Sequence, residues 1–247
     1  MEEKAEIREI SAPYIEDSKG PSVSAAPELS LENIPKNLLA GNDAVNALRP
    51  DSDFVRYSWD RLNDIIRTNQ LGLLGRVPSD LRKYLVWKAG VIEKYGKISN
   101  FLLWERLHWG PDENLLEPKG TRLFECKSDY KILMNDFPYG FEEGIIHIVV
   151  WTKISVPKLD SGLADITPEA RQTIQHFVDS TFKEALSMDS SDILWFKNWA
   201  ALMSIRDLDH FHVLLNKPPV DDRLLNILSE DDNVKQKWAA IDSRVKV

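Results

Sequence analysis

Two histidines near the C-terminal end, His210 and His212, have the spacing best suited to chemistry. They lie in an apolar run, residues 209–215, that is typical of a β-strand. Because side chains alternate between the faces of a strand, both imidazoles point to the same side. The run 145–153 contains His147, so three imidazoles converge if the two strands are neighbours. Neutral imidazole is a nucleophile or base near pH 7 and a common zinc ligand.

A structural role is the competing interpretation of these side chains. A single buried histidine usually completes a hydrogen-bond network, which is how we interpret His108 and His176. A pair on one strand face needs two sets of partners, and this favours a functional role for His210 and His212 over a purely structural one. For His147 taken alone, the structural interpretation is favoured.

The segment between two tryptophans, Trp195 and Trp199, supplies further polar candidates. The aromatic rings themselves predict core packing. Lys197 and Asn198 lie between them and are interpreted as polar groups at the rim of a pocket. Asp209 is kept as a partner for a nearby imidazole.

The elements that must position these residues follow from the hydrophobic pattern. Helical spacing begins near Asp53, with Ser58 as a capping residue, and continues in the segments 78–96 and 98–107. A further helix begins at Thr167 with Pro168 in its first turn. The predicted strands are residues 122–126, 130–134, 145–151, 193–199 and 211–215. This order of helices, strands, helix and strands favours an α+β fold with an antiparallel sheet and flanking helices.

Three regions are predicted along the chain. Residues 1–52 mix charges with Pro, Ser and Ala and have few aromatic side chains, which indicates a disordered tail. Residues 53–108 form an N-terminal helical subdomain. Residues 109–247 form the α+β domain, and the helical subdomain is expected to pack on it as one globular unit.

Composition excludes several classes of protein. The chain has 247 residues, a formal net charge of -8 and a single cysteine, Cys126. An intramolecular disulfide is therefore impossible, and a negative surface opposes nonspecific binding to nucleic acid or anionic membranes. A local basic pocket for a small anion remains compatible with this charge. No apolar stretch approaches the roughly 20 residues of a membrane span. We expect a cytoplasmic protein, with the nucleus as a second location; oligomeric state is not predicted.

Four motifs in order resemble the fungal N-acetylglucosamine-induced protein family. They are the segments 135–140 (NDFPYG), 147–153 (HIVVWTK), 195–199 (WFKNW) and 210–213 (HFHV). The resemblance covers residues 58–218. That family is of unknown biochemical function.

A more distant resemblance is to the histidine triad (HIT-like) superfamily of nucleotide hydrolases and transferases. The shared pattern is a loop with Asn and Pro, a strand from His to Lys, a helix, a strand with Asn, and a strand with alternating histidines. The matching residues here are Asn135, Pro138, His147, Lys153, Asn198, His210 and His212. The resemblance implies a HIT-like sheet and a phosphate-containing ligand such as a nucleotide or nucleotide-sugar, with no cofactor. It also implies that the middle histidine of the triad attacks phosphorus, and that Asn135, His147, Lys153 and Asn198 support the substrate.

One triad position is apolar in this chain. With His212 as the middle residue and nucleophile, the third position is Leu214; with His210 in the middle, the first position is Leu208. Three hypotheses follow: a phosphoester hydrolase or transferase with catalytic His212 or His210, a non-catalytic nucleotide-binding sensor or adaptor, and a three-histidine metal site.

Overall fold

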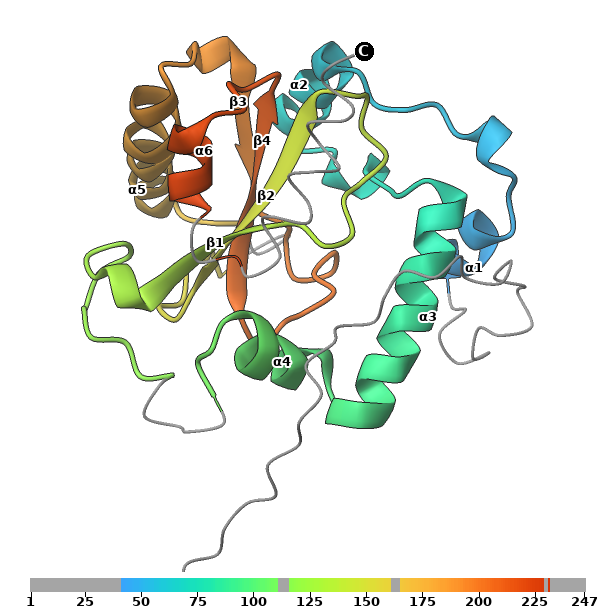
Figure 1. The fold of residues 1–247 in the computed structure, drawn as a ribbon, viewed down its shortest axis with the longest axis horizontal. Helices are drawn as coiled ribbons and strands as arrows, with labels where there is room; N and C mark the ends of the chain where they lie inside the picture. The colour runs from blue at the N-terminus through green and yellow to red at the C-terminus, as the bar shows by residue number, and fades with distance from the viewer. Residues whose placement is uncertain (1–40, 111–115, 161–164, 229–230, 232–247) are drawn as a thin grey trace, which may run out of the picture.

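The computed structural model describes residues 41–110, 116–160, 165–228 and 231. Its centre is a four-stranded sheet in the order β1-β2-β4-β3, and every neighbouring pair is antiparallel. The strands are β1 (Tyr130–Met134), β2 (Ile145–Thr152), β3 (Ile193–Phe196) and β4 (Asp209–Asn216). Helices cover both faces of the sheet (Figure 1). The predicted α+β class with an antiparallel sheet is therefore confirmed.

Strands β2 and β4 form the centre of the sheet and are buried along most of their length. Their register pairs Trp151 with His210, Val149 with His212, and His147 with Leu214. Alternation then places these six side chains on one face of the sheet. The register also sets His212 opposite Phe196 of β3.

The opposite face of the sheet is apolar and is covered by α5 (Pro168–Val178) and α6 (Asp222–Ile227), as Figure 1 shows. Ile148, Val150, Phe211 and Val213 lie on this face and are fully buried against the helices. Thr167 caps α5 by accepting a hydrogen bond from the backbone N–H of Ala170, as predicted. The helix continues into the π-helical turn η8 (Asp179–Glu184).

The face that carries the histidines packs against the N-terminal helices. These are α2 (Trp59–Arg67), α3 (Pro78–Tyr95) and α4 (Ile98–Phe101), followed by the π-helical turn η5 (Leu102–Arg106). One apolar cluster joins Ile98 and Leu102 to Val149 and Trp151, and a second joins Leu62 and other residues near α2 to Leu214. The helical segment therefore encloses the histidine face instead of standing apart from the sheet.

The ordered structure begins before residue 53. Helix α1 (Gly41–Ala47) and the 3-10 turn η3 (Asp51–Asp53) lie within the predicted tail, whose residues 1–40 are outside the described part. Ala47 is fully buried against Leu81 and Leu85 of α3, so contact with a partner helix explains why this polar segment is folded. Ser58 caps α2 as predicted, by accepting from the N–H of Arg61.

Two strand predictions differ from the structure. Residues 122–126 contain no strand; Phe124 has a φ of 64° and its ring stacks on Phe177 at 4.0 Å, so the side chain enters the core from a turn. Strand β3 ends at Phe196, which leaves Asn198 on the following loop. Short 3-10 turns precede one helix and two strands, namely η4 (Leu71–Leu73) before α3, η7 (Lys127–Asp129) before β1 and η9 (Ser190–Asp192) before β3.

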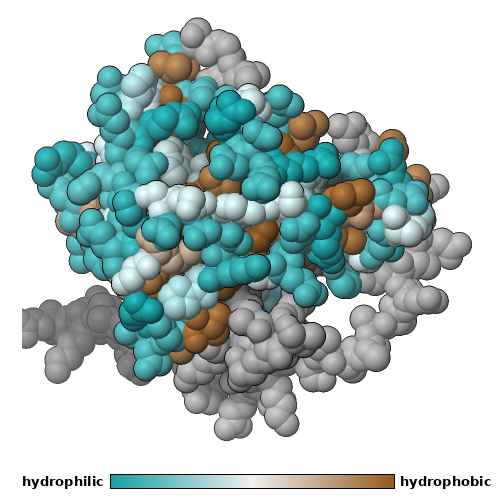
Figure 2. Space-filling model, turned by 90° about the horizontal axis from the view of Figure 1, so that it is seen from above, coloured by the Kyte–Doolittle hydropathy of each residue, from teal (hydrophilic) through white to brown (hydrophobic). Residues whose placement is uncertain are grey.

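The face of the molecule seen in Figure 2 is predominantly polar. Hydrophilic side chains cover most of the face in Figure 2, and hydrophobic ones form small separate patches on it. Among the described residues, no helix is long and apolar enough to cross a membrane.

Candidate functional site

The sheet brings together the histidines singled out by the sequence. His147, His210 and His212 share one face of β2 and β4, and their exposed fractions are 3%, 6% and 5%. The rings of His210 and His212 lie edge to face with centroids 5.5 Å apart, and the His147 and His212 centroids are 5.0 Å apart. The predicted convergence of three imidazoles therefore exists in the fold.

The protonation of His210 is determined by a backbone carbonyl. Its Nδ1 lies 3.0 Å from the carbonyl oxygen of Leu208. Because that oxygen can only accept, Nδ1 must carry the hydrogen, and Nε2 then has a free lone pair in the neutral ring. Among the described residues Nε2 has no hydrogen-bond partner. The ring packs against Trp151 with centroids 4.4 Å apart, which fixes its orientation.

His212 and His147 form a buried hydrogen-bonded pair. His212 Nδ1 and His147 Nε2 are 2.9 Å apart, and the Asn198 amide donates toward His212 Nε2 over a long 3.4 Å. Because Nε2 accepts from the amide, the proton of neutral His212 lies on Nδ1, and Nδ1 then donates to His147 Nε2. Behind them, the Asn135 side-chain oxygen accepts from the Phe137 N–H at 2.9 Å, so its amide nitrogen faces the His147 ring.

Burial keeps all three imidazoles neutral. Desolvation lowers the pKa of His210 to about 4 and that of His147 to about 3, and it holds the pKa of His212 well below its usual range. The positive charge of Arg76 lowers the pKa of His147 and His212 further. Near pH 7 the cluster therefore supplies lone pairs and N–H donors but no imidazolium acid.

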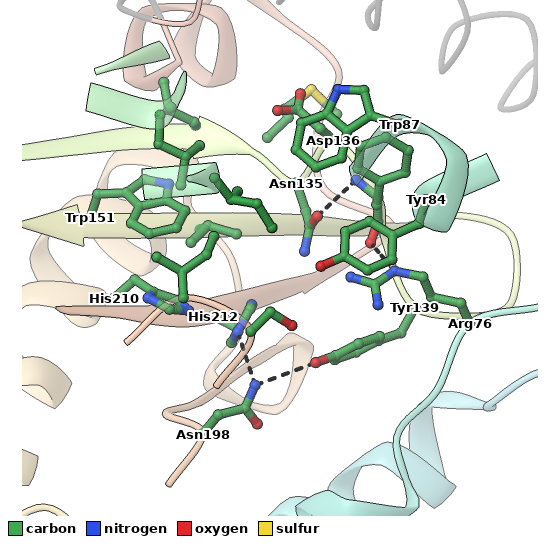
Figure 3. A pocket seen from close by; sticks show the side chains of 18 residues that line it. Arg76, Tyr84, Trp87, Asn135, Asp136, Tyr139, Trp151, Asn198, His210 and His212 are labelled. Atoms are coloured by element: carbon green, nitrogen blue, oxygen red, sulfur yellow. Dashed lines mark hydrogen bonds between the residues drawn. The ribbon is translucent and has the colours of Figure 1, made fainter. Parts of the chain in front are cut away.

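His210 and His212 line a small inner cavity of about 90 Å³ beneath the N-terminal helices. In Figure 3 His210 lies beside Trp151 at one end of this cavity and Arg76 lies at the other, with His212 and Asn198 between them. The Asn198 amide also donates to the Tyr139 hydroxyl at 3.3 Å. The cavity is far smaller than the 300–1,000 Å³ typical of pockets for whole ligands, and it therefore suits one small group of a larger molecule.

Arg76 is a site residue that the sequence analysis did not single out. Its guanidinium carbon lies 4.3 Å from the centre of the Tyr84 ring and 5.3 Å from that of Tyr139, and Nε donates to the Phe137 carbonyl at 2.9 Å. Within the described residues it makes no ion pair. A half-buried arginine held by two aromatic rings retains donors for an anion. Arg76 lies 59 residues before Asn135 in the sequence, and no motif in the sequence indicated that the two residues line the same cavity.

An outer hollow of about 660 Å³ adjoins the inner cavity and has five lining residues in common with it: Arg76, Tyr84, Tyr139, Asn198 and Ser204. This volume lies within the range of ligand pockets. The hollow is lined mainly by residues of the N-terminal segment, including α2 and α3. A molecule in the outer hollow can therefore extend one group toward the histidines.

Four of the six predicted site residues line the inner cavity: Asn135, Asn198, His210 and His212. His147 lies behind His212 and contacts it instead of the cavity. Lys153 does not line the inner cavity. It follows the end of β2, its N–H donates to the Asp129 carbonyl and its ammonium lies 5.3 Å from the Trp109 ring centre. The strand ends at Thr152, so the alternation that would have aligned Lys153 with His147 no longer applies.

A buried ion pair joins the segments that carry the site. Lys197 Nζ and Asp209 Oδ1 are 2.7 Å apart, with side-chain exposures of 2% and 9%. Asp209 also accepts from Ser155 Oγ at 2.8 Å and from the Val156 N–H at 3.0 Å. Lys197 precedes Asn198 and Asp209 precedes His210, so the pair holds these two side chains in register. Lys158 Nζ also lies 3.3 Å from Asp209 Oδ1, so Asp209 pairs with two lysines and not with the imidazole that the sequence suggested.

The geometry does not support a three-histidine metal site. Over the part of the chain that the structure describes, no three His, Cys, Asp or Glu side chains are arranged to hold a metal ion. His147 Nε2 and His212 Nδ1 face each other at hydrogen-bond distance, and His210 Nδ1 is bonded to a carbonyl. The three rings consequently do not present nitrogens to a common point.

These features define a class: an α+β protein whose central antiparallel sheet presents a neutral, buried histidine cluster to a small cavity. The chain belongs to the family described as protein of unknown function DUF3605, whose model matches residues 58–216. It is 32% identical to N-acetylglucosamine-induced protein 1 of Candida albicans over 187 residues, which cover 70% of this chain and 72% of that protein. The predicted membership of the fungal family is thereby confirmed.

Two further relatives agree with this assignment. An uncharacterized protein of Saccharomyces cerevisiae is 30% identical over 162 residues, covering 66% of this chain and 80% of its own length. The crystal structure of HTC1 is similar with a TM-score of 0.59 and 29% identity, covering 70% of this chain and 96% of that one.

Proposed function

We propose that the inner cavity binds a phosphoester of a nucleotide or nucleotide-sugar and that His210 transfers the phosphorus-containing group to water or another acceptor. The observation that carries this proposal is the His210 Nδ1 contact with the Leu208 carbonyl, which directs a lone pair to Nε2. The resemblance to the HIT-like superfamily supports the same chemistry. The sequence favoured His212 as the nucleophile. The hydrogen bonds favour the alternative register, with His210 as the nucleophile, because His212 Nε2 already accepts a hydrogen bond from the Asn198 amide.

The first step forms a bond between His210 Nε2 and phosphorus while the bond from phosphorus to the leaving oxygen breaks, and that oxygen keeps the electron pair. The imidazole becomes cationic, and its Nδ1–H remains bonded to the Leu208 carbonyl. In the second step water or a hydroxyl attacks phosphorus and loses a proton to solvent, the N–P bond breaks, and neutral His210 returns. Arg76 supplies donors for the developing negative charge.

Covalent trapping tests this proposal. The full chain is incubated with radiolabelled adenylate and uridylate substrates and quenched in base, because a phosphorus–nitrogen bond to histidine is labile in acid. We expect a nucleotide adduct on the peptide that contains His210. His210→Asn should abolish the adduct, whereas His176→Asn, on the exposed surface of α5, should retain it. No adduct across a broad nucleotide panel, or an adduct that persists in His210→Asn, contradicts the proposal.

A non-catalytic sensor or adaptor is the second candidate, and the small cavity favours it. Leu208 and Leu214 occupy the apolar triad positions in the two registers, and both are buried in apolar clusters. Such a protein could bind a nucleotide in a fungal response to N-acetylglucosamine, as the name of the Candida albicans relative suggests. Ligand binding without adduct or turnover would favour this function over catalysis.

A further inference from the structure

We infer that Tyr139 is the general acid of the inner cavity, and that its hydroxyl gives a proton to the oxygen that leaves phosphorus when His210 attacks. The inference rests on the proposed function for the reaction at phosphorus, and it adds a catalytic residue outside the histidine cluster. Tyr139 is the fifth residue of the segment 135–140, one of the four motifs of the sequence, and its side chain had no role assigned from the sequence.

The three histidines leave the reaction without a proton donor. Burial keeps them neutral near pH 7. The Nδ1–H of His210 is bonded to the Leu208 carbonyl, and the Nδ1–H of His212 donates to His147. An alkoxide is a strong base, so an alkyl oxygen that leaves phosphorus needs a proton in the transition state. The acid must therefore come from another side chain at the cavity.

The hydroxyl of Tyr139 has a hydrogen to give. Its oxygen accepts from the Asn198 amide at 3.3 Å, and an amide nitrogen can only donate, so the tyrosine hydrogen is directed elsewhere. Within the described residues no acceptor takes this hydrogen. Figure 3 shows the hydroxyl turned toward Asn198, which in turn faces His212. Because Tyr139 lines the inner cavity, its O–H is available to a group bound there.

Tyr139 lies on the side of the cavity where the leaving group must be. Its ring centre is 5.3 Å from the guanidinium carbon of Arg76, and Figure 3 places Arg76 at the opposite end of the cavity from His210. In displacement at phosphorus the attacking and leaving atoms lie roughly in line, on opposite sides. With His210 as the attacking group, the leaving oxygen consequently faces the end that holds Tyr139 and Arg76. Tyr139 also borders the outer hollow, into which the departing alcohol can move.

Two other hydroxyl groups line the same cavity, those of Tyr84 and Ser204. A phenol gives up its proton more readily than the alcohol of a serine, which disfavours Ser204. The ring of Tyr84 stacks on Trp87 with centroids 5.9 Å apart. In the described part of the chain, Tyr139 is the one of the three that is joined to the histidines, through the Asn198 amide. The geometry therefore favours Tyr139 as the acid.

The proton transfer accompanies the first step of the reaction. As the bond from phosphorus to the leaving oxygen breaks, that oxygen keeps the electron pair, takes the Tyr139 proton and departs as a neutral alcohol. The tyrosine oxygen keeps the electrons of its O–H bond. The Asn198 N–H and the positive charge of Arg76 stabilise the resulting tyrosinate. A proton from solvent then restores the hydroxyl.

Two substrates that differ only in their leaving group test the inference. The full chain is mixed with the methyl or the p-nitrophenyl ester of radiolabelled adenylate or uridylate, and the rate of adduct formation is measured after quenching in base. Tyr139→Phe should slow the reaction of the methyl esters by about 100-fold or more, since general acid catalysis typically contributes this much. The p-nitrophenyl esters should react almost as fast as with the wild type, because p-nitrophenolate leaves as a stable anion. Their reaction also shows that the variant is folded.

Tyr95→Phe is the matched control, because the Tyr95 hydroxyl bonds Glu105 outside both the inner cavity and the outer hollow. It should keep the wild-type rate with both kinds of ester. An equal loss with both esters in Tyr139→Phe would indicate a purely structural role and overturn the inference, as would an unchanged rate with the methyl esters. A selective loss in Tyr84→Phe instead of Tyr139→Phe would assign the acid to Tyr84.

Failure of the proposed function gives a different result. If the wild-type chain forms no adduct with either kind of ester, the chemistry at His210 is refuted, and the role of Tyr139 is refuted with it. If the adduct forms and Tyr139→Phe shows no selective loss with the methyl esters, the chemistry at His210 stands and the role of Tyr139 alone is refuted.

Discussion

Asp209→Asn is the substitution with the most distinctive expected effect. Asparagine has nearly the same shape as aspartate, and its side-chain oxygen can still accept from Ser155 and from the Val156 N–H. The change therefore removes the charge opposite Lys197 and also opposite the partly exposed Lys158, whose Nζ lies 3.3 Å from Asp209 Oδ1. Lys197 would remain 2% exposed with an uncompensated ammonium, which also contacts the sulfur of Met203 at 3.9 Å.

The magnitude follows from the burial of the pair. Removing one member of a buried ion pair costs about 3–5 kcal/mol, because the remaining charge stays desolvated. For a chain of this size each kcal/mol lowers the melting temperature by about 2–4 °C, so the expected decrease is about 6–20 °C. The surface substitution Asp207→Asn, two residues earlier, is the control and should change stability by less than about 0.5 kcal/mol.

The loss should also depend on pH with a defined sign. Burial lowers the pKa of Lys197 below its usual value, and the charge of Asp209 opposes that shift. In Asp209→Asn the pKa falls further, so the unfolded chain binds more protons than the folded one between the folded pKa and the unfolded value near about 10.4. Stability of the variant must therefore rise relative to the wild type as pH increases through this window.

Urea unfolding from about pH 6 to about pH 9.5 measures both quantities. A loss below about 1 kcal/mol at neutral pH would refute the argument from burial. A deficit that grows with pH would refute the assignment of the cost to the lysine ammonium. Because Asp209 and Lys197 flank His210 and Asn198, a loss of phosphate affinity in the same variant is also expected.

Three further predictions concern the fold around the site. The pKa of His210 is about 4 in the folded chain and about 6.5 in the unfolded chain, so the folded state loses about 3 kcal/mol of stability as pH falls from 6.5 toward 4. In urea unfolding, His210→Gln should reduce this dependence of stability on pH, whereas His176→Gln should keep it. Gly140→Ala should destabilise by about 1–3 kcal/mol in thermal unfolding, since a Cβ would lie 2.2 Å from Phe54 Cε1, and an unchanged melting temperature would contradict it. Arg106→Met should cost about 3–5 kcal/mol by urea titration, because the buried guanidinium bonds Asp136 at 3.1 Å and Asp231 at 2.9 Å; a neutral result would show that these carboxylates gain other partners.

Local patterns in the sequence determined much of the fold. Ser58 and Thr167 are short polar side chains immediately before helical periodicity, and each caps the helix that was predicted there. Alternation in β4 correctly placed His210 and His212 on one face, and His147 joins them because β2 pairs with β4. These predictions depend on interactions within a few residues, which are encoded by spacing alone.

The same reasoning failed where long-range packing overrides local preference. Phe124 lies in an apolar run that reads as a strand, but its ring is buried by stacking on Phe177, 53 residues away, while its backbone turns. Lys153 was aligned with His147 by alternation, but β2 ends one residue earlier and the side chain turns to Trp109. Neither partner is visible from the local sequence.

The sequence by itself determined which residues are available for chemistry. They are His210 and His212 on one strand, His147 on another, and the two asparagines Asn135 and Asn198. The tertiary structure alone decided how they are used. A backbone carbonyl two residues upstream fixes the lone pair of His210, and its acceptor role depends on the conformation that β4 adopts. Arg76 reaches the cavity because the N-terminal helices fold over the sheet, and it contacts Phe137 and Tyr139, which lie about sixty residues further along the chain. Burial then sets the charge of the cluster, because desolvation is a property of the packed protein and not of the chain.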